Sequence, residues 1–179
     1  TLFVEGRLVQ ADAFPLGIDY ERFRAAARKP EVRELVTAFS EEKGHEGCKI
    51  MLSVERLDYS KGIPDRLQAF DAFLDRHPEW KGRVVLVLVT VPSREGVASY
   101  QALKKQVDGL VGRINGKHST MDWTPVDYYY RSLPFDQLVS LYAASDVMLV
   151  TPLRDGMNLV CKEYLACHGG EGGALVLSE

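Results

Sequence analysis

The stretch "GRVVLVLVTVP", residues 82 to 92, decides the fold class of this chain. It is an unbroken run of aliphatic, mostly β-branched residues that is short enough for a strand and is bounded by Gly82 and Pro92. Strands that are apolar at nearly every position are typical of parallel sheets covered on both faces. The stretch therefore predicts a buried strand of a layered α/β fold.

Strands and helices alternate on both sides of this stretch. Upstream, "CKIMLSVERL" predicts a second buried strand, and Pro64 stands where the next helix can begin. Downstream, helical and strand-like segments continue to the final "GALVLSE". This alternation predicts a doubly wound, mainly parallel Rossmann-like sheet with helices on both faces. Residues 21 to 43 are also predicted to be helical.

Composition excludes several classes of protein. The 179 residues are enough for one domain, with 46% hydrophobic and 26% charged residues. The formal charge of -3 provides no global basic field, so nucleic acid is not an expected partner, and no apolar run suits a membrane span. The three cysteines form no CxxC pair, which favours a reducing, cytoplasmic setting over disulfides or a zinc site.

The loops after the strands are the expected place of function, because doubly wound sheets bind ligands at the carboxyl ends of their strands. In "VERLDYSKG", residues 54 to 62, Arg56 and Lys61 precede a helix start and could hold an anion such as phosphate. The alternative is that both cations are solvated and pair with Glu55, Asp58 or Asp65. Spacing alone does not decide between these interpretations.

The segment "TPLRDGMNLVCKEY", residues 151 to 164, combines an acidic turn with an expected helix start. The backbone amides of residues 157 to 160 would be first-turn donors free to bind a diphosphate. Glu163 lies one turn further on the same face, where its carboxylate could bind both hydroxyls of a ribose. Alternatively, Asp155 only caps the helix and Glu163 pairs with surface cations.

Several long blocks, taken together, resemble the trehalose-6-phosphate synthase family of glycosyltransferases. They are "FPLGID", "VERLDYSKGIPDRLQAF", "GRINGK", "WTPVDYYYRSLPF" and "TPLRDGMNLVCKEY". The resemblance implies one half of a GT-B fold with two Rossmann-like domains. Residues 1–45 would end the N-terminal acceptor domain with its linker, and residues 46–179 would form the C-terminal donor-binding domain, cut short at its C-terminus.

The resemblance also implies a reaction and its site residues. Glucose would pass from UDP-glucose to glucose 6-phosphate with retention, giving trehalose 6-phosphate and UDP. Catalysis would rest on Arg56, Lys61 and Asp155, and Arg94 would bind the acceptor phosphate. The implied donor-binding residues are Arg56, Lys61, Leu133, Asp155, Gly156, Met157, Asn158, Leu159, Val160 and Glu163.

No metal ion or cofactor is expected, because Arg56, Lys61 and helix amides can neutralise the leaving diphosphate and no Asp-x-Asp pair stands in a suitable loop. The 179 residues alone are expected to be inactive without the N-terminal domain. A homo-oligomer is a possible form of the whole protein. Two alternatives stay open: a synthase with another acceptor, such as glucosylglycerol-phosphate synthase, and a non-catalytic regulatory subunit.

Overall fold

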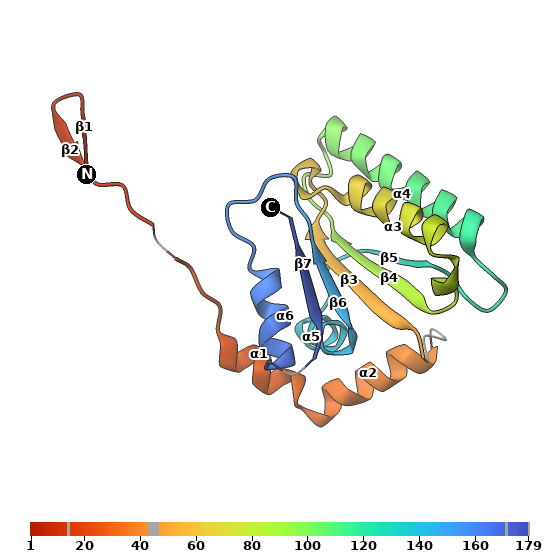
Figure 1. Ribbon diagram of the computed structural model, residues 1–179. Coiled ribbons are helices and arrows are strands. Elements are labelled where there is room, and N and C mark those ends of the chain that lie inside the picture. Colours follow the sequence, from red (N-terminus) through yellow and green to blue (C-terminus); the bar gives the residue numbers. More distant parts are fainter. Residues whose placement is uncertain (14, 43–46, 171, 179) are drawn as a thin grey trace.

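The computed structural model (Figure 1) describes residues 1–13, 15–42, 47–170 and 172–178. In chain order its elements are β1 (Leu2–Val4), β2 (Arg7–Val9), α1 (Tyr20–Ala27), α2 (Pro30–Glu42), β3 (Lys49–Arg56), η1 (Tyr59–Lys61), α3 (Ile63–Arg76), η2 (Pro78–Trp80), β4 (Val84–Val91), α4 (Ala98–His118), β5 (Val126–Tyr130), α5 (Phe135–Ala144), β6 (Val147–Val150), α6 (Val160–His168) and β7 (Ala174–Leu177). Helices and strands alternate from β3 onwards, which confirms the predicted fold class.

The main sheet is parallel throughout, with the strand order β5-β4-β3-β6-β7. The chain builds outward from β3 through β4 to β5 and then returns to the other side of β3 with β6. Such a reversal leaves a crevice at the carboxyl ends of the two strands beside it. The strand order therefore predicts a ligand-binding crevice where the loop after β3 meets the loop after β6.

Apolar side chains fill both faces of this sheet, as the unbroken apolar strands predict. All residues of β4 except Val91 are buried. On one face, α3 and α4 pack against the sheet around Leu67, Val107 and Leu86. On the other face, Tyr142 of α5 and Tyr164 of α6 pack against the strands. The two helical layers hold the strand ends, and hence the loops of the crevice, in fixed places.

The "GRINGK" block is explained by one side chain that joins α4 to the edge strand. The Asn115 amide donates to the Val126 carbonyl and its side-chain oxygen accepts from the Val126 amide, both at 3.0 Å. The Asn115 side chain thus satisfies both backbone groups of Val126, as the backbone of a neighbouring strand would. This residue fixes the helix against the sheet and has no role at the crevice.

Two helices precede the sheet where one helical segment, residues 21 to 43, was predicted. Pro30 begins α2, and a proline disfavours helical geometry in the residue before it, so α1 ends before that point. Both helices pack against the domain, because Ala26 and Val32 share a buried cluster with Val139 of α5. The predicted boundary between residues 45 and 46 lies outside the described residues and stays a prediction.

The first strands form a hairpin that stands apart from the sheet (Figure 1). Glu5 and Gly6 both have positive φ, as the tight turn between two short antiparallel strands requires. Its side chains, Phe3 and Leu8 among them, are exposed. In the part of the chain that the structure describes, no helix is long and apolar enough to cross a membrane.

Candidate active site

The loops after β3 and β6 meet at the crevice and are held together by their backbones. The Ser60 carbonyl of η1 accepts from the amides of Leu153 and Arg154, at 2.8 and 3.1 Å. Gly62 ends η1 with a φ of 62°, and its α-carbon lies so close to the β6 loop that an added Cβ would stand 2.8 Å from the Thr151 carbonyl oxygen. The sequence places a glycine where both the conformation and the space require one.

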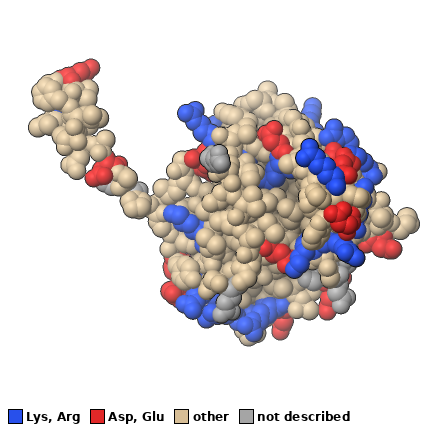
Figure 2. Space-filling view, in the orientation of Figure 1, with Lys and Arg blue, Asp and Glu red and all other residues tan. Residues whose placement is uncertain are grey.

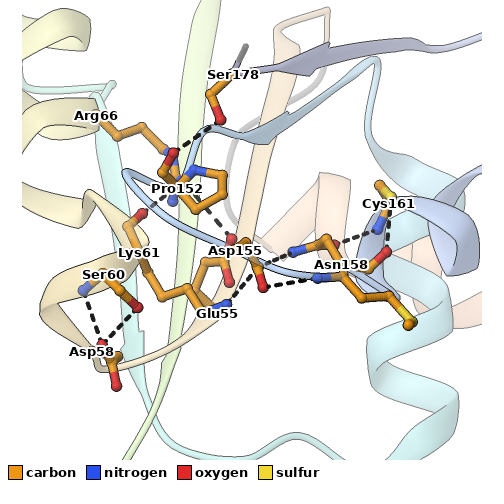
Figure 3. A network of polar contacts seen from close by, with 11 residues as sticks. Glu55, Asp58, Ser60, Lys61, Arg66, Pro152, Asp155, Asn158, Cys161 and Ser178 are labelled. Atoms are coloured by element: carbon orange, nitrogen blue, oxygen red, sulfur yellow. Dashed lines mark hydrogen bonds and ion pairs between the residues drawn. The ribbon is translucent and has the colours of Figure 1, made fainter. Parts of the chain in front are cut away.

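Lys61 and Asp155 face each other across this contact (Figure 3). The Lys61 ammonium lies 2.6 Å from Asp155 Oδ2, and the two side chains are 12% and 17% exposed. Burial of Asp155 opposes its ionisation, but hydrogen bonds from Lys61 and Asn158 outweigh it and hold the pKa of the carboxyl below its ordinary 3.8. The crevice therefore contains a charged pair whose members come from two different loops.

The segment after Asp155 is a loop for longer than the sequence predicted. Helix α6 begins at Val160, so the amides of Met157 and Asn158 belong to the loop and not to the first helical turn. Met157 donates its amide to Asp155 Oδ1 at 3.4 Å. Asn158 bonds Asp155 through its amide group at 3.3 Å and accepts from the Cys161 amide at 2.9 Å. Leu159 directly precedes α6 and makes no side-chain cap bond, so the side chain that caps the first turn is that of Asn158 and not that of Asp155.

A buried guanidinium lies behind this pair and joins the same two loops. Arg66 of α3 donates to Ser53 Oγ at 2.6 Å, to Thr151 Oγ1 at 3.0 Å and to the Lys61 carbonyl at 3.2 Å. Glu55 Oε1 lies 3.8 Å from Arg66, and both side chains are only 3% exposed. Burial raises the pKa of Glu55 even though Arg66 and Lys61 pull it down. Arg66 fixes the position of the segment that carries Lys61.

Glu163 projects from the first turn of α6 and has one partner from α5. The Tyr142 hydroxyl donates to Glu163 Oε2 at 2.8 Å. Burial raises the pKa of Tyr142, with the charge of Glu163 adding to the effect, so the proton stays on the tyrosine and the carboxylate remains an acceptor. Among the described residues the Glu163 carboxylate accepts from the Tyr142 hydroxyl alone, so it retains capacity for hydroxyl donors from a ligand.

Two further cations stand at the strand ends. Arg56, the last residue of β3, is exposed, and its side chain forms no hydrogen bond or ion pair with the other described residues. Arg94, in the loop after β4, is exposed and has a φ of 48°. A non-glycine residue held at positive φ is uncommon and often marks a functional loop. The structure brings both arginines to the edge of the sheet that carries Lys61.

Leu133 lies further from the charged pair, in the loop after β5. It lines a cavity of about 250 Å³ together with Phe39 of α2, Tyr129 of β5 and the neighbouring Arg131. This cavity lies between α2, α5 and the edge strand.

Charged side chains of both signs are interspersed over the face shown in Figure 2, and no large area of one sign dominates it.

Comparison with known proteins decides the family. The model of glycosyltransferase family 20 matches residues 1–179. The chain belongs to this family. It is 49% identical to the 56 kDa subunit of the UDP-forming α,α-trehalose-phosphate synthase of Saccharomyces cerevisiae, covering 98% of this chain and 35% of that protein. The chain thus spans about a third of the length of this relative.

Solved structures agree with the family and with the fold. A UDP-forming α,α-trehalose-phosphate synthase of Burkholderia xenovorans, in complex with glucose-6-phosphate, matches with a TM-score of 0.90 and 36% identity, covering 97% of this chain and 38% of that chain. A structure from E. coli, named for trehalose-6-phosphate and bound with UDP-2-fluoro glucose, matches with a TM-score of 0.89 and 36% identity, over 98% and 38% of the two chains. This family 20 chain therefore has the fold of one of the two Rossmann-like domains of a GT-B glycosyltransferase.

Sequence reasoning identified the cations and carboxylates of the crevice but missed the residues that fix them. Arg66, Tyr142 and Tyr100, whose hydroxyl donates to Asp58 Oδ2 at 2.9 Å, were not proposed for the site. Arg66 left a signal, because it occupies a place in the apolar stripe of α3 between Ile63 and Leu67. A charged residue in the buried stripe of a helix is typical of a side chain that is paired with other polar groups in the core. The two tyrosines left no such signal, since tyrosine is common in cores.

Proposed function

We propose that the full-length protein is a retaining glucosyltransferase that converts UDP-glucose and glucose 6-phosphate into trehalose 6-phosphate and UDP. The observation that carries this proposal is the pair of Lys61 and Asp155, joined at 2.6 Å across the crevice of a family 20 domain. An ammonium suits a diphosphate and a carboxylate suits sugar hydroxyls, so one nucleotide sugar can engage both.

The surrounding residues supply the rest of a donor site. Arg56 and Lys61 would bind the diphosphate, with the amides of Leu159 and Val160, at the start of α6, beside it. Glu163 would accept from the ribose hydroxyls. The segment from Asp155 to Asn158 would hold the glucosyl group. Leu133 would contact the uracil through its backbone.

The chemistry follows from where charge develops. The bond between the anomeric carbon and the β-phosphate oxygen breaks, and its electron pair goes to that oxygen. Arg56 and Lys61 would lie at that point, where their positive charges would stabilise the growing charge of UDP. The acceptor hydroxyl attacks from the same face and passes its proton to the leaving oxygen, so the configuration is retained. We propose that no metal ion or cofactor is used.

Arg94 would hold the phosphate of the acceptor. Its planar guanidinium matches phosphate oxygens and it stands at the neighbouring strand end. The N-terminal domain of the same protein would close the other side of the crevice. We place the reaction in the cytoplasm, which agrees with three free cysteines.

The test uses the full-length protein with UDP-glucose and glucose 6-phosphate, with UDP release and the anomeric configuration of the product as readouts. Arg56→Ala and Lys61→Ala should each lower kcat by about 100-fold or more, because each removes a cation aimed at the leaving group. The matched control is Lys49→Ala, which removes a lysine from the opposite end of β3, where it also pairs with an aspartate, Asp146, at 2.6 Å. Near-normal turnover by either crevice variant would contradict the assignment.

The same assay with glycerol 3-phosphate as acceptor identifies the substrate. Transfer to glucose 6-phosphate alone supports the proposal. A preference for glycerol 3-phosphate would instead identify the protein as a glucosylglycerol-phosphate synthase. A full-length protein that binds UDP-glucose but releases no UDP with either acceptor would be a regulatory subunit.

A further inference from the structure

A chain of polar contacts joins Arg94 to the turn that carries Lys61. Arg94 Nη1 donates to the Tyr100 hydroxyl at 3.2 Å, and this hydroxyl donates to Asp58 Oδ2 at 2.9 Å. The other oxygen of Asp58 accepts from the amide and the hydroxyl of Ser60, at 2.9 and 2.8 Å, and so caps η1. Because η1 ends at Lys61, this series of contacts links Arg94 to the turn that positions Lys61.

The tyrosine in the middle of this chain is held in place. Tyr100 is 3% exposed and begins the buried face of α4. Its ring meets Tyr59 edge-on, with centroids 5.8 Å apart, and the Arg94 guanidinium lies 5.5 Å from its centroid. A buried side chain with an aromatic neighbour on one side and a cation on the other has one available orientation.

The direction of the hydrogen bonds is also fixed. Burial raises the pKa of Tyr100, and its bond to Asp58 raises it further. Burial of Asp58 opposes ionisation, but the bonds from Ser60 and Tyr100 outweigh it, so the pKa of Asp58 is lowered. Tyr100 thus stays protonated and donates a hydrogen bond to Asp58, which leaves the lone pairs of its oxygen to accept from Arg94.

The exposure and the backbone conformation of Arg94 explain why its side chain needs a partner that holds it in place. This residue is exposed and has positive φ, and its loop belongs to a different strand from that of Lys61. An exposed arginine samples many rotamers, and ordering it costs entropy at the moment of binding. The Tyr100 hydroxyl lowers that cost by holding the guanidinium before any ligand arrives.

We propose that Tyr100 is a positioning residue that holds the Arg94 guanidinium for a phosphorylated acceptor and, through Asp58, sets its place relative to Lys61. The inference rests on the proposed function, because it takes Arg94 as the acceptor-phosphate cation. It adds that the two substrates are aligned by a bridge of protein groups and not by the two cations acting separately.

The test is Tyr100→Phe in the full-length protein, which removes the hydroxyl and keeps the ring. KM for glucose 6-phosphate should rise about tenfold, as expected for losing one hydrogen bond that orients a charged group, while KM for UDP-glucose and kcat stay within about twofold. The control is Tyr164→Phe, whose hydroxyl bonds the Ser145 and Asp146 carbonyls, away from the crevice. It should change none of these constants.

A double-mutant cycle shows whether Tyr100 acts through Arg94. Arg94→Ala should raise KM for glucose 6-phosphate by more than Tyr100→Phe does, and adding Tyr100→Phe to it should raise this KM no further. Fully additive effects would overturn the proposal, as would an unchanged acceptor KM or equal rises in both KM values. If Tyr100→Phe fails to fold, Asp58→Asn takes its place in the cycle and the same non-additivity is required.

The failure of this inference differs from the failure of the proposed function. A wild-type enzyme that transfers glucose while Tyr100→Phe keeps its acceptor KM refutes the inference alone. A wild-type protein with no transfer refutes the proposed function, and inorganic phosphate then becomes the probe, with binding measured by calorimetry. Weaker phosphate binding by Tyr100→Phe, with no further loss on adding Arg94→Ala, would support the positioning role, and equal binding would overturn it.

Discussion

Replacing Gly62 by alanine tests whether the close approach of the two loops builds the crevice. The residue has a φ of 62°, so an alanine there adopts a left-handed conformation that costs about 1–2 kcal/mol. Its Cβ would also stand 2.8 Å from the Thr151 carbonyl oxygen and 3.4 Å from Leu153 Cγ. Overpacking against backbone adds about 1–3 kcal/mol, and the η1 turn must move away from the β6 loop.

The matched control is Gly82→Ala, because Gly82 has a φ of 76° and open space around its missing Cβ. Both variants carry the conformational cost and the same gain from a less flexible unfolded chain. Their difference in unfolding free energy, measured by urea denaturation of the full-length protein, should therefore be about 1–3 kcal/mol. Gly62→Ala should also weaken UDP-glucose binding in calorimetry, while Gly82→Ala leaves it unchanged. Equal losses of stability with equal affinities would refute the reasoning.

Three further outcomes follow from the described contacts. Asn158→Ala should cost about 1 kcal/mol of stability, because α6 loses its cap, and a change below a few tenths by urea denaturation would contradict this role. The pKa of Asp155 is lowered, so its stabilisation is present above pH 3.8 and lost as the pH falls through the lower folded value. The difference in unfolding free energy between wild type and Asp155→Asn should shrink in acid, and a pH-independent difference would exclude the ion pair as its source. The pKa of Glu55 is raised, so the wild type should lose stability relative to Glu55→Gln as the pH rises above 4.5, and denaturation at pH 4 and pH 7 checks the sign.

The fold was predictable because its strands carry an unambiguous pattern. The apolar run of β4 and the regular alternation of helices and strands leave little choice but a covered parallel sheet. Helix boundaries were less predictable where a side chain decides them. The start of α6 depends on Asn158 reaching the Cys161 amide, and this contact is available only once Asp155 has turned the loop. The break between α1 and α2 at Pro30 could have been read from the sequence.

The chemistry of the crevice was half predictable for a related reason. Residue types and strand-end positions indicate Arg56, Lys61 and Asp155, because the topology brings strand ends to one edge of the sheet. Which charges pair depends on side-chain directions that the sequence does not contain. The sequence left open whether Arg56 and Lys61 pair with Glu55, Asp58 or Asp65, and among the described residues Lys61 forms its ion pair with Asp155 instead. The assignment of the individual roles stays a prediction.

In the proposed donor site, the pair of Lys61 and Asp155 would make the crevice selective in what it binds. Each group already satisfies the other, so a ligand that offers only an anion frees Lys61 but leaves a carboxylate without its cation. A ligand that offers only hydroxyls engages Asp155 but leaves the Lys61 ammonium without its carboxylate. A molecule with both groups at the right separation exchanges the pair for two new contacts. In the proposed donor site, the ion pair would therefore disfavour binding of free phosphates and free sugars, although neither would be too large to enter.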